Sequence, residues 1–412
     1  MTQTLPNPGA DGDRAVGYAG TCDVAIVGGG LVGTSLAVAL QDTPLRVALI
    51  EAAPPPQSEA SWDERCIALN DASRRIFRAL GVWEALRAEA APILATHISE
   101  RGRFGVSHFE AAEAGLEALG YNVPLRAIGK ALERRVSQAL RLTLFRPARV
   151  CGLARGDAGV RLDLETSEGR RTLEAKLAVA ADGARSALRE WLGIEAQTRD
   201  YAQQAIVTAV RLSRPHRGVA YERFTPDGPL ALIPKPGLAM SLVWTTPQAW
   251  VERRMGWSEA EFLAAAQETF GGRLGRFLEL GRRWAYPLTR VLSERLTAPR
   301  VVFVGNAAQT LHPVAAQGFN LGLRDVAALA ELLAEAADPG EAELLSAYER
   351  RRAQDRDRVA DLTDLMVRVF SNRAPVLAQA RHWGLVAVDL VPPLRRAVLQ
   401  QHLGHLGLPR VS

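Results

Sequence analysis

The sequence predicts an α/β fold in which a parallel sheet is interleaved with an antiparallel sheet and followed by carboxyl-terminal helices. The parallel sheet is predicted by a strand–turn–helix–strand pattern over residues 22–51 and by an apolar, β-branched run at 301–304 that ends in glycine. The antiparallel sheet is predicted by strand-like runs over 202–246, separated by Pro and Gly turns. With 412 residues, 48% of them hydrophobic, the chain has room for two or three domain-sized units.

The first turn carries a glycine pattern that favours a dinucleotide. Gly28, Gly30 and Gly33 form G-x-G-x-x-G between an apolar strand and a helix. These glycines permit a tight turn, close approach of the backbone to a pyrophosphate, and close helix–strand packing. The next strand ends on Glu51, whose carboxylate suits a ribose hydroxyl and repels a 2′-phosphate. The pattern therefore predicts a Rossmann-like domain that binds the adenosine of FAD or NAD.

Two later strand ends extend this site. A β-meander is predicted from apolar runs near 144–153, 159–165 and 172–181. Its last strand ends at Asp182-Gly183, before a helix from Ala187, whereas a simple NAD dehydrogenase continues with βαβ repeats. Together with the strand that ends at Gly305, these turns are expected to converge on one extended cofactor.

These features resemble the class A flavoprotein aromatic hydroxylases. In that family the Asp-Gly turn lies near the FAD pyrophosphate, and a strand–Gly-Asp element places its acid on the ribityl chain. Here Gly305 is followed by Asn306, which is uncharged. This departure is typical of the ubiquinone-biosynthesis branch, which the chain resembles over about residues 22–405. The motifs that carry this resemblance lie at 63–69, 123–129, 222–232, 241–244, 285–288 and 305–325.

The resemblance implies an oxygen-dependent reaction on one tightly held FAD. NAD(P)H reduces the flavin, O2 adds at C4a, and the hydroperoxide hydroxylates an electron-rich ring. Within this branch, the resemblance specifically implies hydroxylation of 2-polyprenyl-6-methoxyphenol to 2-polyprenyl-6-methoxy-1,4-benzoquinol in ubiquinone biosynthesis. Three alternatives stay open: a hydroxylase acting at another ring carbon or on another aromatic, a non-catalytic flavoprotein scaffold, and a flavin reductase of isoprenoid double bonds.

The resemblance also divides the chain into interleaved segments. The expected FAD domain comprises 21–93, 122–197 and 284–350, the substrate domain comprises 94–121 and 198–283, and a helical tail follows at 351–412. A strand at Ala95–Arg101 is expected to join the antiparallel sheet. Helical periodicity over 257–280, which includes Phe262, Phe270, Leu274 and Phe277, predicts a helix behind that sheet.

The polar, uncharged segment 305–325 is expected to hold the flavin ring. Free N–H groups at a helix amino terminus near Gly318 and Asn320 stabilise the negative charge of a reduced flavin. His312 and Gln317 are the candidate catalytic residues. The alternative for His312 is a loop histidine bonded to backbone, and the alternative for Gln317 is a helix cap.

Four further charged residues, Arg65, Arg126, Arg324 and Asp325, are given expected roles. The resemblance implies that Arg65 lies on a helix and reaches the FAD phosphates or ribityl region. Arg126 is either close to the cofactor or structural. Arg324 and Asp325 are interpreted as helix-surface or pairing residues.

The substrate side is predicted from the antiparallel sheet. Its candidate lining residues are Phe224, Leu230, Leu232, Val243 and Trp244. Since side chains alternate along a strand, about half of them face each side, so packing in the sheet core is the alternative. An apolar lining suits a polyprenyl phenol.

Composition and targeting signals narrow the remaining possibilities. The net charge is +5, but no basic block with interleaved aromatics is present, so nucleic-acid binding is not expected. Cys22, Cys66 and Cys151 are distant and odd in number, which favours a reducing compartment without disulfides or a metal site. The first twenty residues lack the apolar core of a signal peptide, and no apolar stretch has the roughly 20 residues of a membrane span. A cytoplasmic protein, at most peripheral to the inner membrane face, is expected.

The carboxyl-terminal tail is amphipathic from Tyr348 onward, with a break at Pro392-Pro393. The favoured interpretation is two helices packed on the FAD domain. The functional hypothesis is that the tail docks other ubiquinone-biosynthesis proteins or a membrane surface, because a polyprenyl substrate is delivered from lipid.

Overall fold

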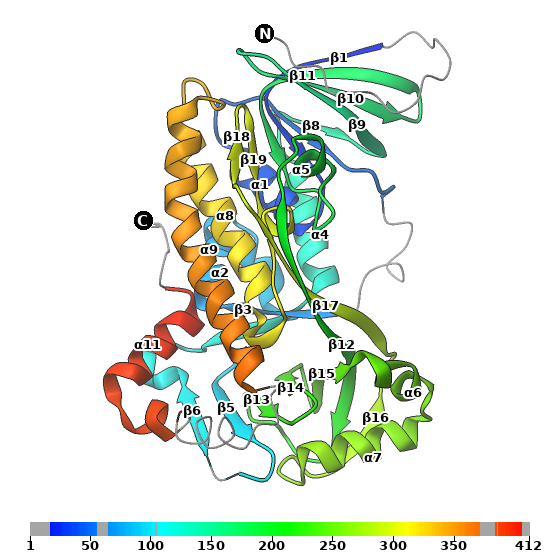
Figure 1. Ribbon diagram of the computed structural model, residues 1–412, viewed down its shortest axis with the longest axis vertical. Helices are drawn as coiled ribbons and strands as arrows, with labels where there is room; N and C mark the ends of the chain where they lie inside the picture. The colour runs from blue at the N-terminus through cyan, green and yellow to red at the C-terminus, as the bar shows by residue number, and fades with distance from the viewer. Residues whose placement is uncertain (1–16, 56–64, 104, 371–383, 385, 406–412) are drawn as a thin grey trace.

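The computed structural model describes residues 17–55, 65–103, 105–370, 384 and 386–405. Its elements form two units, one above the other in Figure 1, which are joined by long strands. Among the described helices, none combines the length and apolar character needed to cross a membrane.

The upper unit is built on a mainly parallel sheet with the strand order β18–β19–β11–β1–β2–β8. β1 is its central strand and pairs in parallel with β11 and β2, while β19 pairs in parallel with β11. The predicted βαβ unit and the hairpins of the meander are confirmed, and β8 joins β2 in parallel. The strands are β1 (Gly17–Val27), β2 (Val47–Ile50), β8 (Leu142–Phe145), β9 (Ala148–Arg155), β10 (Val160–Thr166), β11 (Gly169–Ala180), β18 (Thr297–Ala298) and β19 (Val301–Phe303).

Helices bury this sheet and a small second one. The main core packs β1, β2, β11 and β19 against α1, α8 and α9. A second core packs α2, α3 and α4 around the three-stranded sheet β3–β7–β4. The bounds are α1 (Leu31–Ala39), β3 (Cys66–Asn70), α2 (Asp71–Ala79), α3 (Trp83–Arg87), β4 (Ala91–Ile93), β7 (Gly120–Pro124), α4 (Leu125–Val136), α5 (Ala187–Trp191), η4 (Gly305–Ala307), η5 (Val314–Ala316), α8 (Gln317–Ala334) and α9 (Ala342–Phe370).

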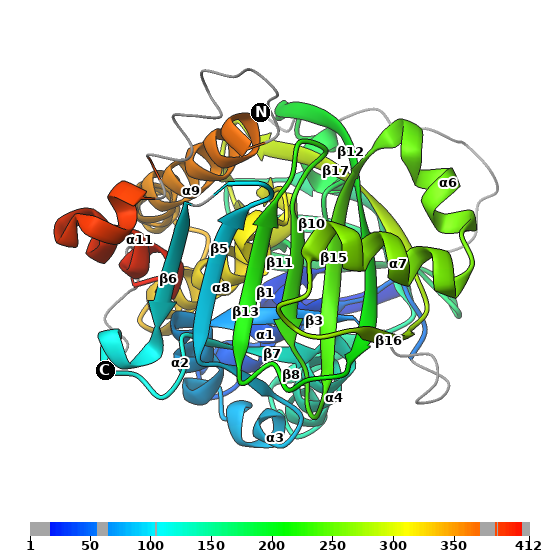
Figure 2. The same cartoon turned by 90° about the horizontal axis from the view of Figure 1, so that it is seen from below.

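The lower unit is a nine-stranded sheet with the order β20–β17–β12–β15–β14–β13–β5–β6 and with β16 beside β12. All its pairs are antiparallel except β5 with β13, which are parallel. The helix α7 crosses its lower face, away from the upper unit (Figure 2). The bounds are β5 (Ala95–Glu100), β6 (Val106–Glu110), η2 (Ala111–Ala114), β12 (Ala196–Leu212), β13 (Val219–Phe224), β14 (Leu230–Pro234), β15 (Ala239–Pro247), η3 (Gln248–Trp250), α6 (Val251–Gly256), α7 (Glu259–Phe270), β16 (Phe277–Leu280), β17 (Trp284–Ser293) and β20 (Gln309–Thr310).

The helix predicted over 257–280 is wrong beyond Phe270. Gly271 follows with φ 95°, a conformation that ends the helix and that other residues rarely adopt. Leu274 lies in the following loop, and Phe277 begins β16. Both side chains are buried with α7 in the same core, so the apolar spacing reflected burial and not helical periodicity.

The long strands β12 and β17 connect the two units. They pair with each other over most of their length, from Ala196 opposite Ser293 to Val207 opposite Trp284. The predicted domain limits at 197/198 and 283/284 fall near the ends of this ribbon, and they stay a prediction.

The two carboxyl-terminal helices pack on different units. α9 packs on α8, as expected, but α11 (Pro392–Leu403) lies beside the lower unit. Its Leu399 and Leu403 pack against Phe109 of β6 and against Leu119. The prediction that both helices pack on the FAD domain is therefore wrong for α11, because its apolar stripe fits the outer edge of the second sheet.

Candidate active site

The carboxyl ends of four neighbouring parallel strands meet at one edge of the upper sheet. Since the order is β19–β11–β1–β2, the turns at Gly305, Asp182, Gly28 and Glu51 lie side by side. The predicted convergence of three distant turns is confirmed. In open α/β sheets, this edge is where ligands bind.

The glycine-rich turn is shaped to receive an extended group. A Cβ at Gly28 would lie 2.4 Å from the Ala181 carbonyl oxygen, and one at Gly33 would lie 2.0 Å from the Gly28 carbonyl oxygen. At Gly30, by contrast, no atom lies within 4 Å of a Cβ position. Two glycines are therefore required by the fold, and the third leaves the backbone open to a ligand, as the dinucleotide pattern requires.

The acid after β2 is fixed by backbone donors. The N–H of Gly29 donates to Glu51 Oε2 at 2.6 Å, and the N–H of Ala53 donates to Oε1 at 2.7 Å. Each oxygen keeps a further lone pair for a ribose hydroxyl. Glu51 thus stands at the glycine turn with its carboxylate already oriented.

The Asp-Gly turn after β11 contains a carboxylate oxygen in need of a donor. The N–H of Leu188 donates to Asp182 Oδ2 at 3.3 Å. Asp182 Oδ1 is buried and accepts no hydrogen bond from any residue between 17 and 405 that the structure describes. Gly183 follows with φ 87°. A hydroxyl-bearing chain at this edge satisfies that oxygen, so the site fits the sugar and ribityl portions of FAD.

The third turn pairs a glycine in the left-handed conformation with an exposed amide. Gly305 has φ 58°, and a Cβ there would lie 3.0 Å from both methyls of Val32. Asn306 is exposed between buried neighbours, so its amide faces outward at the ligand edge.

A buried ion network holds this third turn in place. Asp325 Oδ2 accepts from the N–H of Gly305 at 3.0 Å and from Gln309 Nε2 at 2.5 Å. Asp325 Oδ1 accepts from Arg352 Nε at 2.7 Å, and Arg352 also pairs with Asp355. These neighbouring carboxylates raise the pKa of Arg352 although burial lowers it.

Arg324 completes the network, with its Nη1 at 2.8 Å from Asp355 Oδ1. Arg324 and Asp325 are fully buried. Of their two predicted roles, the pairing role is confirmed and the surface role is wrong.

His312 lies on the polar segment, buried to 1% exposure. Its Nδ1 accepts from the N–H of Val314 at 3.2 Å, and its ring meets the Tyr201 ring edge-on at 5.2 Å. Burial lowers the pKa of His312 to about 4, so the ring is neutral and its Nε2 carries the proton. Nε2 is buried and donates to no group in the described chain. The alternative interpretation, a histidine bonded to the backbone, therefore holds for Nδ1. Nε2 is a buried donor that still needs an acceptor.

The start of α8 combines an open glycine with a clamped amide. No atom lies within 4 Å of a Cβ position at Gly318. Asn320 Nδ2 donates to the carbonyl oxygens of Ala68 (2.9 Å) and Ala316 (2.6 Å), and its Oδ1 accepts from the N–H of Asn70 (3.1 Å). Asn320 therefore ties α8 to β3, while the predicted flavin contact stays a prediction. Gln317, the first residue of α8, is buried.

The two arginines differ in setting. Arg65 precedes β3, so its predicted place on a helix is wrong, and its guanidinium stacks over the Tyr286 ring at 4.5 Å. Arg126 pairs with Glu89 at 2.6 Å on the surface.

One face of the lower sheet is turned toward the upper unit, and we call it the inner face. Asn122 of β7 donates to Ser241 Oγ at 3.1 Å and to the Pro234 carbonyl oxygen at 2.8 Å. The stacking of Arg65 on Tyr286 joins the same two units. By strand register, a row of partly buried side chains crosses this face: Ile98, Glu222, Ala231, Val243, Val207 and Trp284.

The candidate lining residues fall on different faces. Val243 belongs to the inner-face row, and Phe224 shares that face with Glu222. Leu230, Leu232 and Trp244 point the other way, into the core under α7, where Trp244 meets the Phe262 ring at 5.5 Å. For these three residues the structure favours the core-packing alternative, because strand alternation turns them away from the inner face.

Glu222 was not among the predicted site residues. It is the acid in the middle of the otherwise apolar inner-face row, and its carboxylate has no hydrogen bond or ion pair with another described residue. Burial raises the pKa of Glu222 to about 7. The signal in the sequence was an acid between Ala220 and Phe224 at inward-facing strand positions. Perturbed carboxyls of this kind are frequent at functional sites.

A cofactor edge on one unit and a substrate-type sheet turned toward that unit define the class of FAD-dependent aromatic-ring monooxygenases. The fold is shared with p-nitrophenol 4-monooxygenase PnpA from Pseudomonas putida DLL-E4, at TM-score 0.77 and 18% identity, over 95% of this chain and 100% of that one. A model of the family described as "FAD binding domain" matches residues 21–363. The chain belongs to this family and is an FAD-dependent monooxygenase of the class A type.

Curated relatives place the chain within the branch that includes the ubiquinone-biosynthesis hydroxylases. It is 40% identical over 391 residues to ubiquinone hydroxylase UbiL of Rhodospirillum rubrum, which covers 94% of this chain and 90% of that protein. It is 34% identical to 3-demethoxyubiquinol 3-hydroxylase of Escherichia coli, over 93% of this chain and 98% of the relative. It is also 27% identical to the human ubiquinone biosynthesis monooxygenase COQ6, over 92% and 91%.

Proposed function

We propose that this protein hydroxylates the aromatic ring of 2-polyprenyl-6-methoxyphenol to give 2-polyprenyl-6-methoxy-1,4-benzoquinol in ubiquinone biosynthesis. The observation that carries the proposal is the inner face of the lower sheet. There, one carboxyl lies in a partly buried apolar row that is turned toward the unit carrying the FAD edge. An apolar, weakly acidic wall suits a phenol with a long hydrocarbon substituent.

The chain's own residues hold the cofactor in this account. Gly28, Gly30 and Gly33 admit the pyrophosphate to the backbone, and Glu51 accepts from the adenosine ribose. The second group of assigned cofactor residues comprises Arg65, Asp182, Gly183, Gly305, Asn306, Gly318 and Asn320. When bound and reduced by NAD(P)H, FAD supplies the activated oxygen from O2.

Glu222 positions the substrate. Its carboxylate accepts a hydrogen bond from the phenol hydroxyl. As the phenol proton shifts toward Glu222, the phenol oxygen gains negative charge and the ring becomes more electron-rich. Because its pKa is raised to about 7, the group is poised to accept a proton at neutral pH. Ala231, Val243 and Val207 contact the apolar part of the substrate along the row.

His312 and Gln317 remain our candidate catalytic residues at the start of α8. The neutral His312 ring offers Nε2–H as a donor to a developing negative charge. A neutral donor suits this place better than a carboxylate, which would repel a reduced flavin anion.

A second candidate function is hydroxylation at another ring carbon of the same prenylated phenol series. The Escherichia coli relative, whose name specifies position 3, favours this alternative at 34% identity. The inner-face row serves both reactions, because it determines the class of substrate and not the ring position.

The test uses the purified protein with its FAD. We expect stoichiometric FAD and an NAD(P)H oxidation that a polyprenyl methoxyphenol stimulates, with a product one oxygen atom heavier. A scaffold would bind FAD without substrate-stimulated oxidation. A reductase would consume NAD(P)H without O2. Either result would contradict the proposal.

The partner and location assignments stay predictions. We propose a cytoplasmic protein that meets the inner membrane face peripherally and docks other ubiquinone-biosynthesis proteins through its tail. In the described part of the tail, the large apolar side chains exposed for such contacts are Leu362, Leu365, Leu390, Val391 and Leu394.

A further inference from the structure

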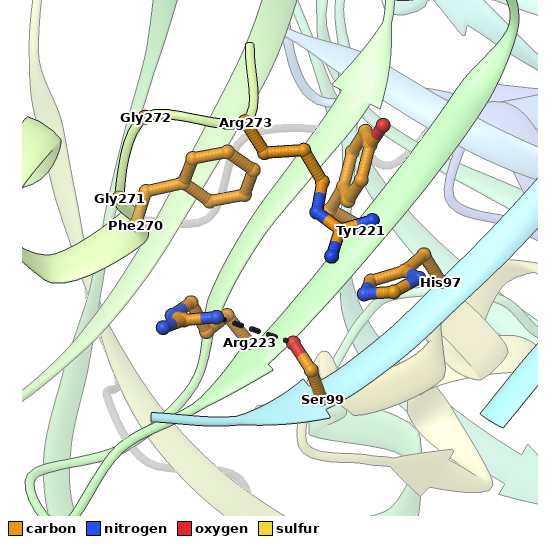
Figure 3. A pocket seen from close by; sticks show the side chains of 8 residues that line it. All are labelled: His97, Ser99, Tyr221, Arg223, Phe270, Gly271, Gly272 and Arg273. Atoms are coloured by element: carbon orange, nitrogen blue, oxygen red, sulfur yellow. Dashed lines mark hydrogen bonds between the residues drawn. The ribbon is translucent and has the colours of Figure 1, made fainter. Parts of the chain in front are cut away.

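The opposite face of the lower sheet contains a small polar pocket beside the end of α7 (Figure 3). Its floor is an array of four side chains from the paired parallel strands β5 and β13. His97 is paired with Tyr221 and Ser99 with Arg223, so all four project to the same side. Arg273, on the glycine-rich loop after α7, forms the rim. The cavity is about 180 Å³, roughly six times the ~30 Å³ share of one water in the liquid.

The pocket concentrates positive charge without a carboxylate. Its lining comprises two guanidiniums and no Asp or Glu. Arg223 is held in place, because its Nε donates to the Thr269 carbonyl oxygen at 3.1 Å and its Nη1 lies 3.5 Å from Ser99 Oγ. Arg273 has no ion pair or hydrogen bond with another described residue, and Figure 3 shows its guanidinium directed over the floor toward His97.

The pKa shifts of the pocket residues agree with an excess of positive charge in the pocket. Burial and the charges of Arg101 and Arg273 lower the pKa of Arg223. Burial, with the neighbouring arginines and His108, lowers the pKa of His97 to about 4, so this ring stays neutral. The nearest carboxylate on the strand, Glu222, projects to the inner face. An anion in the pocket would relieve the repulsion between the guanidiniums.

We propose that this pocket, formed by His97, Ser99, Tyr221, Arg223 and Arg273, binds the phosphate of a phosphate ester. The positive charges of two guanidiniums match the charge of about −1.5 to −2 that a phosphomonoester carries at neutral pH. The Ser99 hydroxyl, 3.5 Å from Arg223 Nη1, adds a donor at the floor, which suits an anion with several acceptor oxygens. The site lies across the sheet from the inner face, so its ligand does not compete with the phenol.

Two sources carry this chemistry, a soluble phosphate ester and a phospholipid headgroup, and two probes distinguish them. The protein is saturated with FAD, so that its own pyrophosphate site is filled. Calorimetry then measures binding of glycerol 3-phosphate. Flotation measures binding to phosphatidylcholine vesicles with and without phosphatidic acid. Binding of the soluble ester alone identifies a small ligand, and binding of acidic vesicles alone identifies a headgroup. Either result supports the proposal.

Arg273→Gln is the test variant, and Arg276→Gln is its matched control. Both arginines are exposed on the same loop, but only Arg273 lines the pocket. Removal of a charge-assisted contact is expected to weaken binding by about ten-fold or more in Arg273→Gln, and to leave Arg276→Gln unchanged. Arg223→Gln should show a similar loss. Equal binding by Arg273→Gln and Arg276→Gln, or no saturable binding of either probe by the native protein, overturns the proposal.

Discussion

At the scale of the residue, the glycine turn separates structural from ligand requirements. Gly33 has no room for a Cβ, whereas Gly30 has open space around it in the ligand-free chain. The sequence pattern predicts both glycines but does not distinguish these roles, because each depends on what lies beside the turn in three dimensions.

This difference predicts contrasting variants. Gly33→Ala forces overlap with the Gly28 carbonyl and should lower the free energy of unfolding by roughly 1–3 kcal/mol or more. Gly30→Ala should fold with near-native stability but bind FAD at least about ten-fold more weakly. Thermal unfolding of the apoprotein and flavin fluorescence titration measure the two effects. Equal loss of stability in both variants would contradict the assignment.

A second prediction at the scale of the residue concerns the role of Glu222 in the pH dependence of the reaction. If its carboxylate accepts from the phenol, kcat/KM of the native enzyme should rise through about pH 7. Glu222→Gln should lower kcat/KM by about 10²-fold or more and remove this rise. The control is Glu165→Gln, an exposed acid on β10. An unchanged pH profile in Glu222→Gln would remove Glu222 from the reaction.

The same residue makes a prediction about stability. The pKa of Glu222 is raised in the fold from 4.5 to about 7, so ionisation favours the unfolded chain as pH rises through that range. Glu222→Gln should therefore gain stability relative to the native protein at pH 8, and this gain should disappear near pH 4. A residue with a purely structural role would instead lose stability on substitution. Urea unfolding of Glu222→Gln and the native protein at pH 8 and pH 4 measures the two stabilities and distinguishes these outcomes.

At the scale of the element, α8 and α9 hold the third strand-end turn through buried charges. Breaking a buried pair leaves an unpaired charge and typically costs about 3–5 kcal/mol. Arg352→Met should incur this cost and weaken FAD binding, because Asp325 then no longer orients Gly305. Arg351→Met is the matched control, since Arg351 pairs with Glu331 on the surface. Similar denaturant midpoints for the two variants would refute the role of the network.

Element prediction from the sequence succeeded where local pattern and burial coincide. The strand ends at Gly28, Asp182 and Gly305 were predictable because each apolar run stops at a turn residue. The helix predicted past Phe270 was wrong, since burial by distant elements imitates helical spacing. The helical setting of Arg65, which the family resemblance implied, was also wrong, because Arg65 directly precedes β3. The buried ion network was missed because its members, as far apart in the sequence as Arg324 and Asp355, meet only after folding. Glu222 was missed because only the strand register places it in the inner-face row.

At the scale of the whole molecule, α11 lies on the lower unit, and His405, just after this helix, contacts the upper unit. His405 Nε2 lies 2.9 Å from Asp71 Oδ2, and Arg395 pairs with Glu113. This docking was not predictable from amphipathic spacing, which shows that a helix has an apolar face but not which surface covers it.

The docking of α11 predicts a further contrast. Leu403 is fully buried against the outer edge of the lower sheet, whereas Leu394 is exposed. Leu403→Ala should lower the free energy of unfolding by about 2–5 kcal/mol, and Leu394→Ala should change it by less than about 0.5 kcal/mol. Differential scanning calorimetry compares the two. Unchanged stability in Leu403→Ala would mean that α11 is not docked in solution.

The central claim is the hydroxylation itself, and lipid mass spectrometry of the source cell with the gene deleted tests it most directly. Accumulation of 2-polyprenyl-6-methoxyphenol with loss of ubiquinone is the result that we predict. Accumulation of a different hydroxylation precursor would move the protein to another ring carbon. Unchanged ubiquinone without any precursor would contradict the proposed function.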